Sequence, residues 1–267
     1  MKIKTLIYIV LILIILSIAV PSLISSNPDL KKSTALSIAD FGLENKKYEW
    51  SLSACDWMLE DSPYDSEILK RKVAVLTILE DYEGALENQR IIQELSPLDM
   101  TKEDWHNLAV LNARTNNTKD SVDSYEQVLK SCELMLKTSP DDSSAIMEKA
   151  DVLIKLQRYD EAIEAYNVVI NEEPSNAGAW IGLGDAYLFK SMYLQGQLKD
   201  MYKELGRAPS GEKTGYDMSS FESHRKAVES YNKAVEIDPL SYPMVAAKIM
   251  GGFEKTVSGY QDILKNL

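Results

Sequence analysis

The stretch AWIGLGDAYLF, residues 179–189, places large side chains at intervals of three and four residues, with a small one among them. At this spacing Trp180, Leu183 and Tyr187 fall on one face of an α-helix. Gly184 lies between them, and a residue without a side chain lets a second helix approach closely. The stretch therefore predicts a helix that packs tightly against a neighbour.

The stretch KAVESYNKAVEIDP, residues 226–239, has the features of that neighbour. Ala227 is small where the two helices would meet, and Tyr231 is large beside the contact. Pro239 follows the helix, because proline disfavours helical geometry at the residue before it. Together the two stretches predict a pair of closely packed helices.

Prolines recur along the chain at a fixed interval. Pro63 and Pro97 are 34 residues apart, and so are Pro140 and Pro174. A fixed period of this length is the sequence signature of a stacked array, in which each unit buries its apolar face against the next. Long runs of Ala, Leu, Glu, Lys and Ile at helical spacing also predict an all-α fold.

The pattern Trp-x2-Leu-Gly-x2-Tyr at residues 180–187, followed by Ala227, Tyr231 and Pro239, closely resembles the tetratricopeptide repeat (TPR), a helix–turn–helix of 34 residues. The resemblance implies an α-solenoid of TPR repeats that ends in a C-terminal capping helix. We expect a degenerate repeat at 32–65, repeats at 66–99, 102–142 (with an extended second helix) and 143–176, a fifth repeat at 177–241, and the capping helix at 242–267.

The fifth repeat is predicted to be split. Pro174 and Pro239 are 65 residues apart, or 31 more than one repeat, which places an insertion at about 190–222. Apolar spacing indicates that the first helix continues or that a short helix follows, and we expect the second helix to begin near His224. Between them, GRAPSGEKTG at residues 206–215 is typical of a loop.

The same ten residues approach the pattern Gly-x4-Gly-Lys-Ser/Thr that binds nucleotide phosphates. Glu212, however, puts a carboxylate where backbone amides should face an anion, and it displaces the lysine by one position. That motif also requires a buried β-strand before it, whereas an amphipathic helix is predicted here. Phosphate binding at this loop is therefore not expected.

The N-terminus is strongly apolar. Leu6 to Ile24 is a run of 19 uncharged residues, roughly 28 Å long as a helix, which is close to the thickness of a bilayer core. We expect one hydrophobic N-terminal helix within residues 1–28, acting as a transmembrane signal anchor. Lys2 and Lys4 favour a cytoplasmic N-terminus and an extracytoplasmic body. The alternative is a signal peptide that is cleaved after Ala19 and leaves a secreted protein.

Composition and motifs exclude several classes of function. A formal net charge of −12 disfavours binding to nucleic acid. His106 and His224 lie in different repeats without further ligands at metal-binding spacing, so no metal site is expected. Cys55 and Cys132 fall on buried stripes and are predicted to be core thiols rather than a disulfide. No catalytic arrangement is recognisable, so we expect neither an enzyme, nor a cofactor, nor a small-molecule substrate.

The resemblance implies protein–protein recognition, because TPR proteins receive a peptide or a partner helix in a concave groove lined by the first helix of each repeat. The groove positions carried over onto this sequence include Asp40, Lys70, His106, Met147, Asp151, Ile181, Asp185 and Leu188. Asp40, Asp151 and Asp185 share one repeat position and predict a row of acids, which favours a basic or mixed apolar partner. An alternative is that these acids are only solvated surface.

The sequence thus predicts a non-catalytic scaffold or assembly factor, tethered to a membrane, that binds a partner protein. The alternative is an enzyme accessory or catalytic module that uses the insertion at 188–223.

Overall fold

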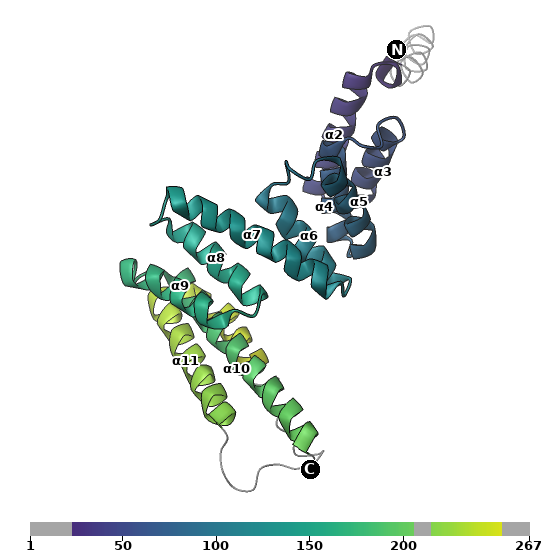
Figure 1. Cartoon of the computed structure of the whole chain (residues 1–267). Helices are drawn as coiled ribbons and strands as arrows, with labels where there is room; N and C mark the ends of the chain where they lie inside the picture. The colour runs from purple at the N-terminus through teal and green to yellow at the C-terminus, as the bar shows by residue number, and fades with distance from the viewer. Residues whose placement is uncertain (1–22, 206–214, 253–267) are drawn as a thin grey trace, which may run out of the picture. The chain divides into compact units, whose positions relative to one another are not determined.

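A computed structural model describes residues 23–205 and 215–252 (Figure 1). Most of the predicted anchor at 1–28, nearly all of the GRAPSGEKTG stretch and the last fifteen residues of the predicted cap lie outside the described residues. Within the described part of the chain every regular element is a helix, and there is no strand. No described helix combines the length and the apolar character needed to cross a membrane.

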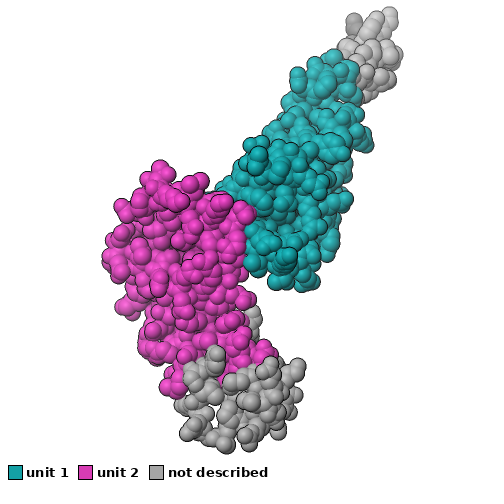
Figure 2. All heavy atoms as spheres, viewed as in Figure 1, with its two compact units in different colours: residues 1–124 teal, residues 125–267 magenta. Residues whose placement is uncertain are grey.

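The chain divides into two compact units, residues 1–124 and residues 125–267, coloured separately in Figure 2. The first unit holds α2 (Pro28–Glu44), α3 (Tyr48–Leu59), α4 (Ser66–Ile78), α5 (Tyr82–Leu95), α6 (Lys102–Arg114) and the start of α7 (Thr118–Thr138). Here α2 packs on α3 and α4 on α5, and the second helix of each pair contacts the first helix of the next.

The second unit holds the rest of α7, then α8 (Ser143–Lys155), α9 (Tyr159–Glu172), α10 (Ala177–Leu205), α11 (Gly215–Ile237) and the short 3-10 helix η1 (Pro239–Ser241). Residues 242–252 continue as a helix. Within this unit α8 pairs with α9 and α10 pairs with α11, while α9 and α8 both contact α10.

Several helices begin at a polar side chain that caps their first turn. Asp65, Asp81 and Asp142 each accept hydrogen bonds from backbone N–H groups in the first turn of the helix that follows. Thr101 forms a capping box with Asp104, in which each side chain bonds the backbone N–H of the other residue. These contacts satisfy amides that an α-helix leaves without a partner at its first turn.

Four turns between paired helices share one geometry. Lys46, Glu80, Asn116 and Gln157 have left-handed backbones, with φ between 57° and 61°. In each case the next amide bonds back to a carbonyl five residues earlier, over 2.7 to 2.9 Å, as from Asp81 to Leu76. This is the Schellman arrangement that ends helices, here built without glycine. The repeat is therefore visible in backbone geometry as well as in side-chain pattern.

The degenerate first repeat is explained by one close contact. A Cβ at Gly42 would lie 2.3 Å from the Ser51 Oγ, so only glycine fits there. Buried Ser51 donates a hydrogen bond of 2.5 Å to the Ala39 carbonyl, and Ser121 bonds the Ala109 carbonyl at 2.8 Å in the same way. Serine at this crossing thus ties the two helices of a pair together.

The insertion is mainly helical. α10 runs unbroken for 29 residues, so the first helix continues, which is one of the two predicted possibilities. The expectation that the second helix begins near His224 is wrong, because α11 begins at Gly215. Buried Ser191 and Ser220, whose Oγ atoms are 3.2 Å apart, hold the extended helices together. Figure 1 shows α10 and α11 running side by side.

Candidate protein-binding faces

Four of the predicted groove residues come together on α8 and α10 of the second unit. Met147 and Asp151 lie on α8, and Ile181 and Asp185 lie on α10. Met147, Ile181 and Asp185 are half-buried, whereas Asp151 is open to solvent. We refer to these four residues as the acidic face.

A tyrosine supports each of the two carboxylates. Tyr166 on α9 donates a hydrogen bond of 2.5 Å to Asp151, and Tyr231 on α11 donates one of 2.6 Å to Asp185. Both tyrosines are almost completely buried, with 2% and 1% of their surface exposed. Their hydroxyls therefore contact the acidic face from the protein interior and fix the position of the two carboxylates.

The glycines of AWIGLGDAYLF make room for these tyrosines. A Cβ on Gly182 would lie 2.3 Å from the Tyr166 ring, and one on Gly184 would lie 2.5 Å from the Tyr231 ring. The predicted close approach at Gly184 is confirmed. The close approach of Tyr166 to Gly182 was not predicted, although Gly182 lies only two residues before Gly184 in the sequence.

The two carboxylates differ in charge environment. Asp185 forms an ion pair with Lys248, whose Nζ lies 2.7 and 2.6 Å from its two oxygens. Asp151 has no cation within ion-pair distance among the described residues. Desolvation by the surrounding helices, aided by the charge of Asp185, raises the pKa of Asp151, while Tyr166, Lys155 and Lys248 act in the opposite direction. Asp151 is therefore a carboxylate whose charge is incompletely compensated.

Leu188 does not lie on the acidic face. It is 7% exposed and packs in a cluster with Ala227, Tyr231 and Val245. Its expected place in the groove is corrected to the core, because Ala227 and Tyr231 of α11 and helical residues 242–252 pack against this part of α10.

In the first unit, two of the three predicted groove residues are tied up in ion pairs between neighbouring first helices. Asp40 accepts from Arg71 at 2.7 Å, and Lys70 reaches Asp104 at 2.8 Å. Burial raises the pKa of Asp104, but hydrogen bonds from Lys70 and Thr101 outweigh it and leave the pKa below its usual value. His106 is exposed on α6.

These partners were missed by sequence reasoning. Lys70 and Asp104 are 34 residues apart, so opposite charges at one repeat spacing were an available signal. Lys248 had no such signal, since it belongs to the segment after the last repeat.

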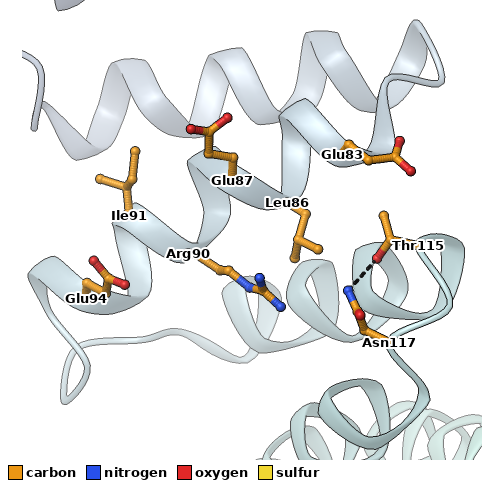
Figure 3. A pocket seen from close by; sticks show the side chains of 8 residues that line it. All are labelled: Glu83, Leu86, Glu87, Arg90, Ile91, Glu94, Thr115 and Asn117. Carbon is orange, nitrogen blue, oxygen red and sulfur yellow. Dashed lines mark hydrogen bonds between the residues drawn. The ribbon is translucent and has the colours of Figure 1, made fainter.

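A surface depression lies beside α5 in the first unit. It is a hollow of about 500 Å³, lined by Glu83, Leu86, Glu87, Arg90, Ile91, Glu94, Thr115 and Asn117. Figure 3 shows that these side chains come from α5 and from the turn between α6 and α7. Arg90 is already engaged by Asp120 at 3.1 Å and Asn112 at 3.3 Å, and Asn117 donates to Thr115 at 2.9 Å. No sequence motif indicated this hollow.

The described part of the chain shows neither a metal-binding cluster nor a reactive cysteine. Residues 23–205 and 215–252 contain no group of three or more His, Cys, Asp or Glu side chains that could hold a metal ion. Cys55 and Cys132 are buried and neither forms a disulfide. Burial raises the pKa of the Cys55 thiol to about 11, which keeps it protonated and unreactive at neutral pH.

Comparison with known proteins agrees with the fold. The family model described as TPR repeat matches residues 150–189. A solved structure of MamA from Desulfovibrio magneticus RS-1 is 16% identical, covers 78% of this chain and 96% of its own, and has a TM-score of 0.51. A MamA RS-1 double mutant is also 16% identical, covers 79% and 96%, and has the same TM-score of 0.51. YrrB, titled a TPR protein with an unusual peptide-binding site, is 17% identical and covers 80% and 90%, with a TM-score of 0.49.

The class of protein follows from these observations. The chain is an all-α helical solenoid like those of TPR proteins, and residues 150–189, which carry most of the acidic face, match the repeat itself. The predicted fold class is confirmed to that extent. The hydrophobic N-terminal helix and the C-terminal cap remain predictions.

Proposed function

We propose that this protein is a non-catalytic scaffold or assembly factor that binds a peptide or helix of a partner protein on the acidic face of its second unit. The observation that carries the proposal is the state of Asp151. Its carboxylate is partly desolvated, held in place by Tyr166 and open to solvent, with no ion-pair partner in the described chain. Binding to a surface of this kind is favourable when the partner supplies the missing positive charge.

The chemistry of the partner follows from the neighbours of Asp151. Met147 and Ile181 are half-buried apolar side chains on the same face. A partner segment that carries one Lys or Arg next to an apolar residue would fill both requirements. Because a bound cation favours the ionised form of Asp151, we expect affinity to fall as the pH drops through the raised pKa of this group.

Membrane tethering remains part of the proposal on the strength of the sequence. The uncharged run from Leu6 to Ile24 has the length of a bilayer span, and Lys2 and Lys4 precede it. In this arrangement the second unit would act outside the cytoplasm. Protease protection of intact cells expressing the full-length chain would test it, because an extracytoplasmic body is digested from outside.

The binding face is tested by photo-crosslinking in cells. A photoreactive amino acid at Met147 should form an adduct with a partner protein, whereas the same amino acid at Val168, an exposed position on α9, should not. Adding Asp151→Lys should reduce the Met147 adduct by about tenfold, since it replaces attraction with repulsion at one site. Asp141→Lys, which changes the charge of an exposed residue before α8, is the matched control.

Two outcomes would count against this binding face. One is an equal yield of adducts from Met147 and Val168, which would mean non-specific contact. The other is a Met147 adduct that Asp151→Lys and Asp141→Lys reduce by the same factor, which would remove Asp151 from the interaction.

A further inference from the structure

Asp151 and Asp185 belong to two copies of one local arrangement. In each copy the carboxylate lies on the first helix of a repeat, and its Oδ1 accepts a hydrogen bond from a tyrosine on the second helix. That tyrosine is Tyr166 for Asp151, at 2.5 Å, and Tyr231 for Asp185, at 2.6 Å. The copies differ in one component, because Asp185 is paired with a cation and Asp151 has none within ion-pair distance among the described residues.

The occupied copy shows how the cation binds. Lys248 Nζ lies 2.7 Å from Oδ1 of Asp185 and 2.6 Å from Oδ2, so one ammonium group bridges both oxygens. The Tyr231 hydroxyl keeps its hydrogen bond to Oδ1 at the same time. An ammonium group is a compact charge with three donors, which lets it share the carboxylate with the tyrosine. A lysine therefore suits a carboxylate that a tyrosine already holds.

Arginine is found on a carboxylate with different surroundings. Arg71 donates through Nε to Asp40 at 2.7 Å. Tyr166 comes 15 residues after Asp151, whereas the residue 15 positions after Asp40 is Cys55. Among the described residues Asp40 accepts no hydrogen bond from a tyrosine, so its cation does not share the carboxylate with a hydroxyl. The copy with lysine is therefore the one that matches Asp151.

The helix that should carry a cation for Asp151 is present, but it has no side chain at the required position. In the first unit the cation of Asp40 comes from the next first helix, where Arg71 lies 31 residues further along the chain. Gly182 on α10 lies 31 residues after Asp151. Since α10 packs against α8, Gly182 stands where the repeat would place the in-chain cation of Asp151.

Packing explains why the chain does not supply this cation itself. A Cβ at Gly182 would lie 2.3 Å from the Tyr166 ring, so the tyrosine that holds Asp151 also excludes a side chain from position 182. The next residue, Leu183, is buried. Lys155 lies one turn beyond Asp151 on α8 and lowers the pKa of that carboxyl, but the two form no ion pair in the described part of the chain. The position of the cation is therefore left open to another molecule.

We infer that Asp151 and Tyr166 form a binding site for one lysine side chain of the partner protein. The ammonium group of that lysine bridges the two oxygens of Asp151, as Lys248 bridges those of Asp185. The inference rests on the proposed function, since it names the group that the partner presents to the acidic face. Gly182 keeps the site open, because it omits the cation that other repeats receive from within the chain.

A cross-link of zero length tests the inference, because it forms only between groups in direct contact. A water-soluble carbodiimide activates a carboxylate, and the amine of a lysine in contact then displaces the activating group. An amide forms, and the carbodiimide leaves as a urea. The guanidinium group of arginine stays protonated and does not react in this way. The reagent is applied to lysates of cells that express the full-length chain, and linked peptides are identified by mass spectrometry.

The expected result is an amide between Asp151 and one lysine of the protein that the photoreactive amino acid at Met147 captures. The link between Asp185 and Lys248 within the chain is the positive control, since these groups are already in contact. Asp141, an exposed carboxylate before α8, is the negative control and should not link to the same lysine.

An exchange of charges follows once the linked lysine is known. Asp151→Lys combined with aspartate in place of the partner's lysine should restore the Met147 adduct to about half of the wild-type yield or more, because the two changes compensate only if the groups meet.

The inference and the proposed function fail in different ways. A Met147 adduct and an Asp185–Lys248 link, without a link from Asp151 to a lysine, would overturn the inference and leave the binding face in place. So would an exchange of charges that restores nothing. Absence of the Met147 adduct would refute the proposed function, and the inference with it.

Discussion

At the scale of single residues, Asp151 combines two properties that rarely occur together, access to solvent and a raised pKa. Desolvation is the larger cause of the shift, and the nearby charge of Asp185 adds to it. A carboxyl whose pKa is higher in the folded chain binds its proton more tightly there than in the unfolded chain. Its ionisation therefore costs stability as the pH rises through the raised pKa, and the cost persists at neutral pH.

We expect Asp151→Asn to raise the thermal midpoint of unfolding at pH 7, because the amide keeps an acceptor for Tyr166 and carries no charge. The gain should shrink as the pH falls from the raised pKa of Asp151 towards the ordinary carboxyl value of 3.8, and it should vanish below that value, where Asp151 is protonated in both the folded and the unfolded wild-type chain. Thermal melts followed by circular dichroism between pH 3 and 7 measure it, with Asp141→Asn as the control. A pH-independent gain, or a loss at pH 7, would contradict the expectation.

The positions of the acidic residues could be predicted from the sequence, but their ion-pair partners could not. The shared repeat position of Asp40, Asp151 and Asp185 could be read from the period. Their cations could not, because Arg71 and Lys248 come from other helices, and the direction of a long basic side chain depends on packing. Two of the three acids are thus neutralised within the chain, and only Asp151 keeps the property that the whole row was expected to have.

At the scale of elements, α10 contains glycines in opposite surroundings. Gly182 and Gly184 sit against the rings of Tyr166 and Tyr231, whereas a Cβ on Gly196 would meet nothing within 4 Å. The same substitution on one helix should therefore have opposite effects. This contrast separates packing from helix propensity, which alone would favour alanine at all three positions.

We expect Gly182→Ala to destabilise the protein by about 1–3 kcal/mol, because the added methyl group displaces the Tyr166 ring and its hydrogen bond to Asp151. Gly196→Ala should instead stabilise it by about 0.5–1 kcal/mol, since alanine is the better helix former. Urea unfolding of both variants gives the two values. Equal effects at the two glycines would show that Tyr166 is not held as described.

The apolar spacing in the insertion predicted helical structure but not the bounds of α10 and α11. Apolar spacing after Leu188 allowed a continued helix or a second short one, and the continuous 29-residue α10 resolves that choice. The early start of α11 was missed because Gly215 and the serines that follow are poor helix formers. Contacts such as that between Ser191 and Ser220 make the helix favourable there.

At the scale of the whole molecule, each repeat should be stabilised mainly by the repeats next to it. In stacked repeats each repeat contacts only the adjacent ones. A destabilising substitution should therefore affect its own repeat and the neighbouring repeats more than distant ones. We expect Gly182→Ala to speed amide hydrogen exchange in α8 to α11 while α2 to α4 keep their protection. Hydrogen-exchange mass spectrometry resolves these helices, and equal acceleration in both units would show a single cooperative transition instead.

The sequence by itself determined the helical class, the period and the close approach at Gly184, because these depend on spacing and side-chain size along the chain. It also located the acidic positions on α8 and α10. Only the tertiary structure decided that Lys248 neutralises Asp185 and that Leu188 is buried. The physical reason is that charge pairing and burial depend on which helices meet, and residues distant in sequence or outside the repeat supply one side of each contact.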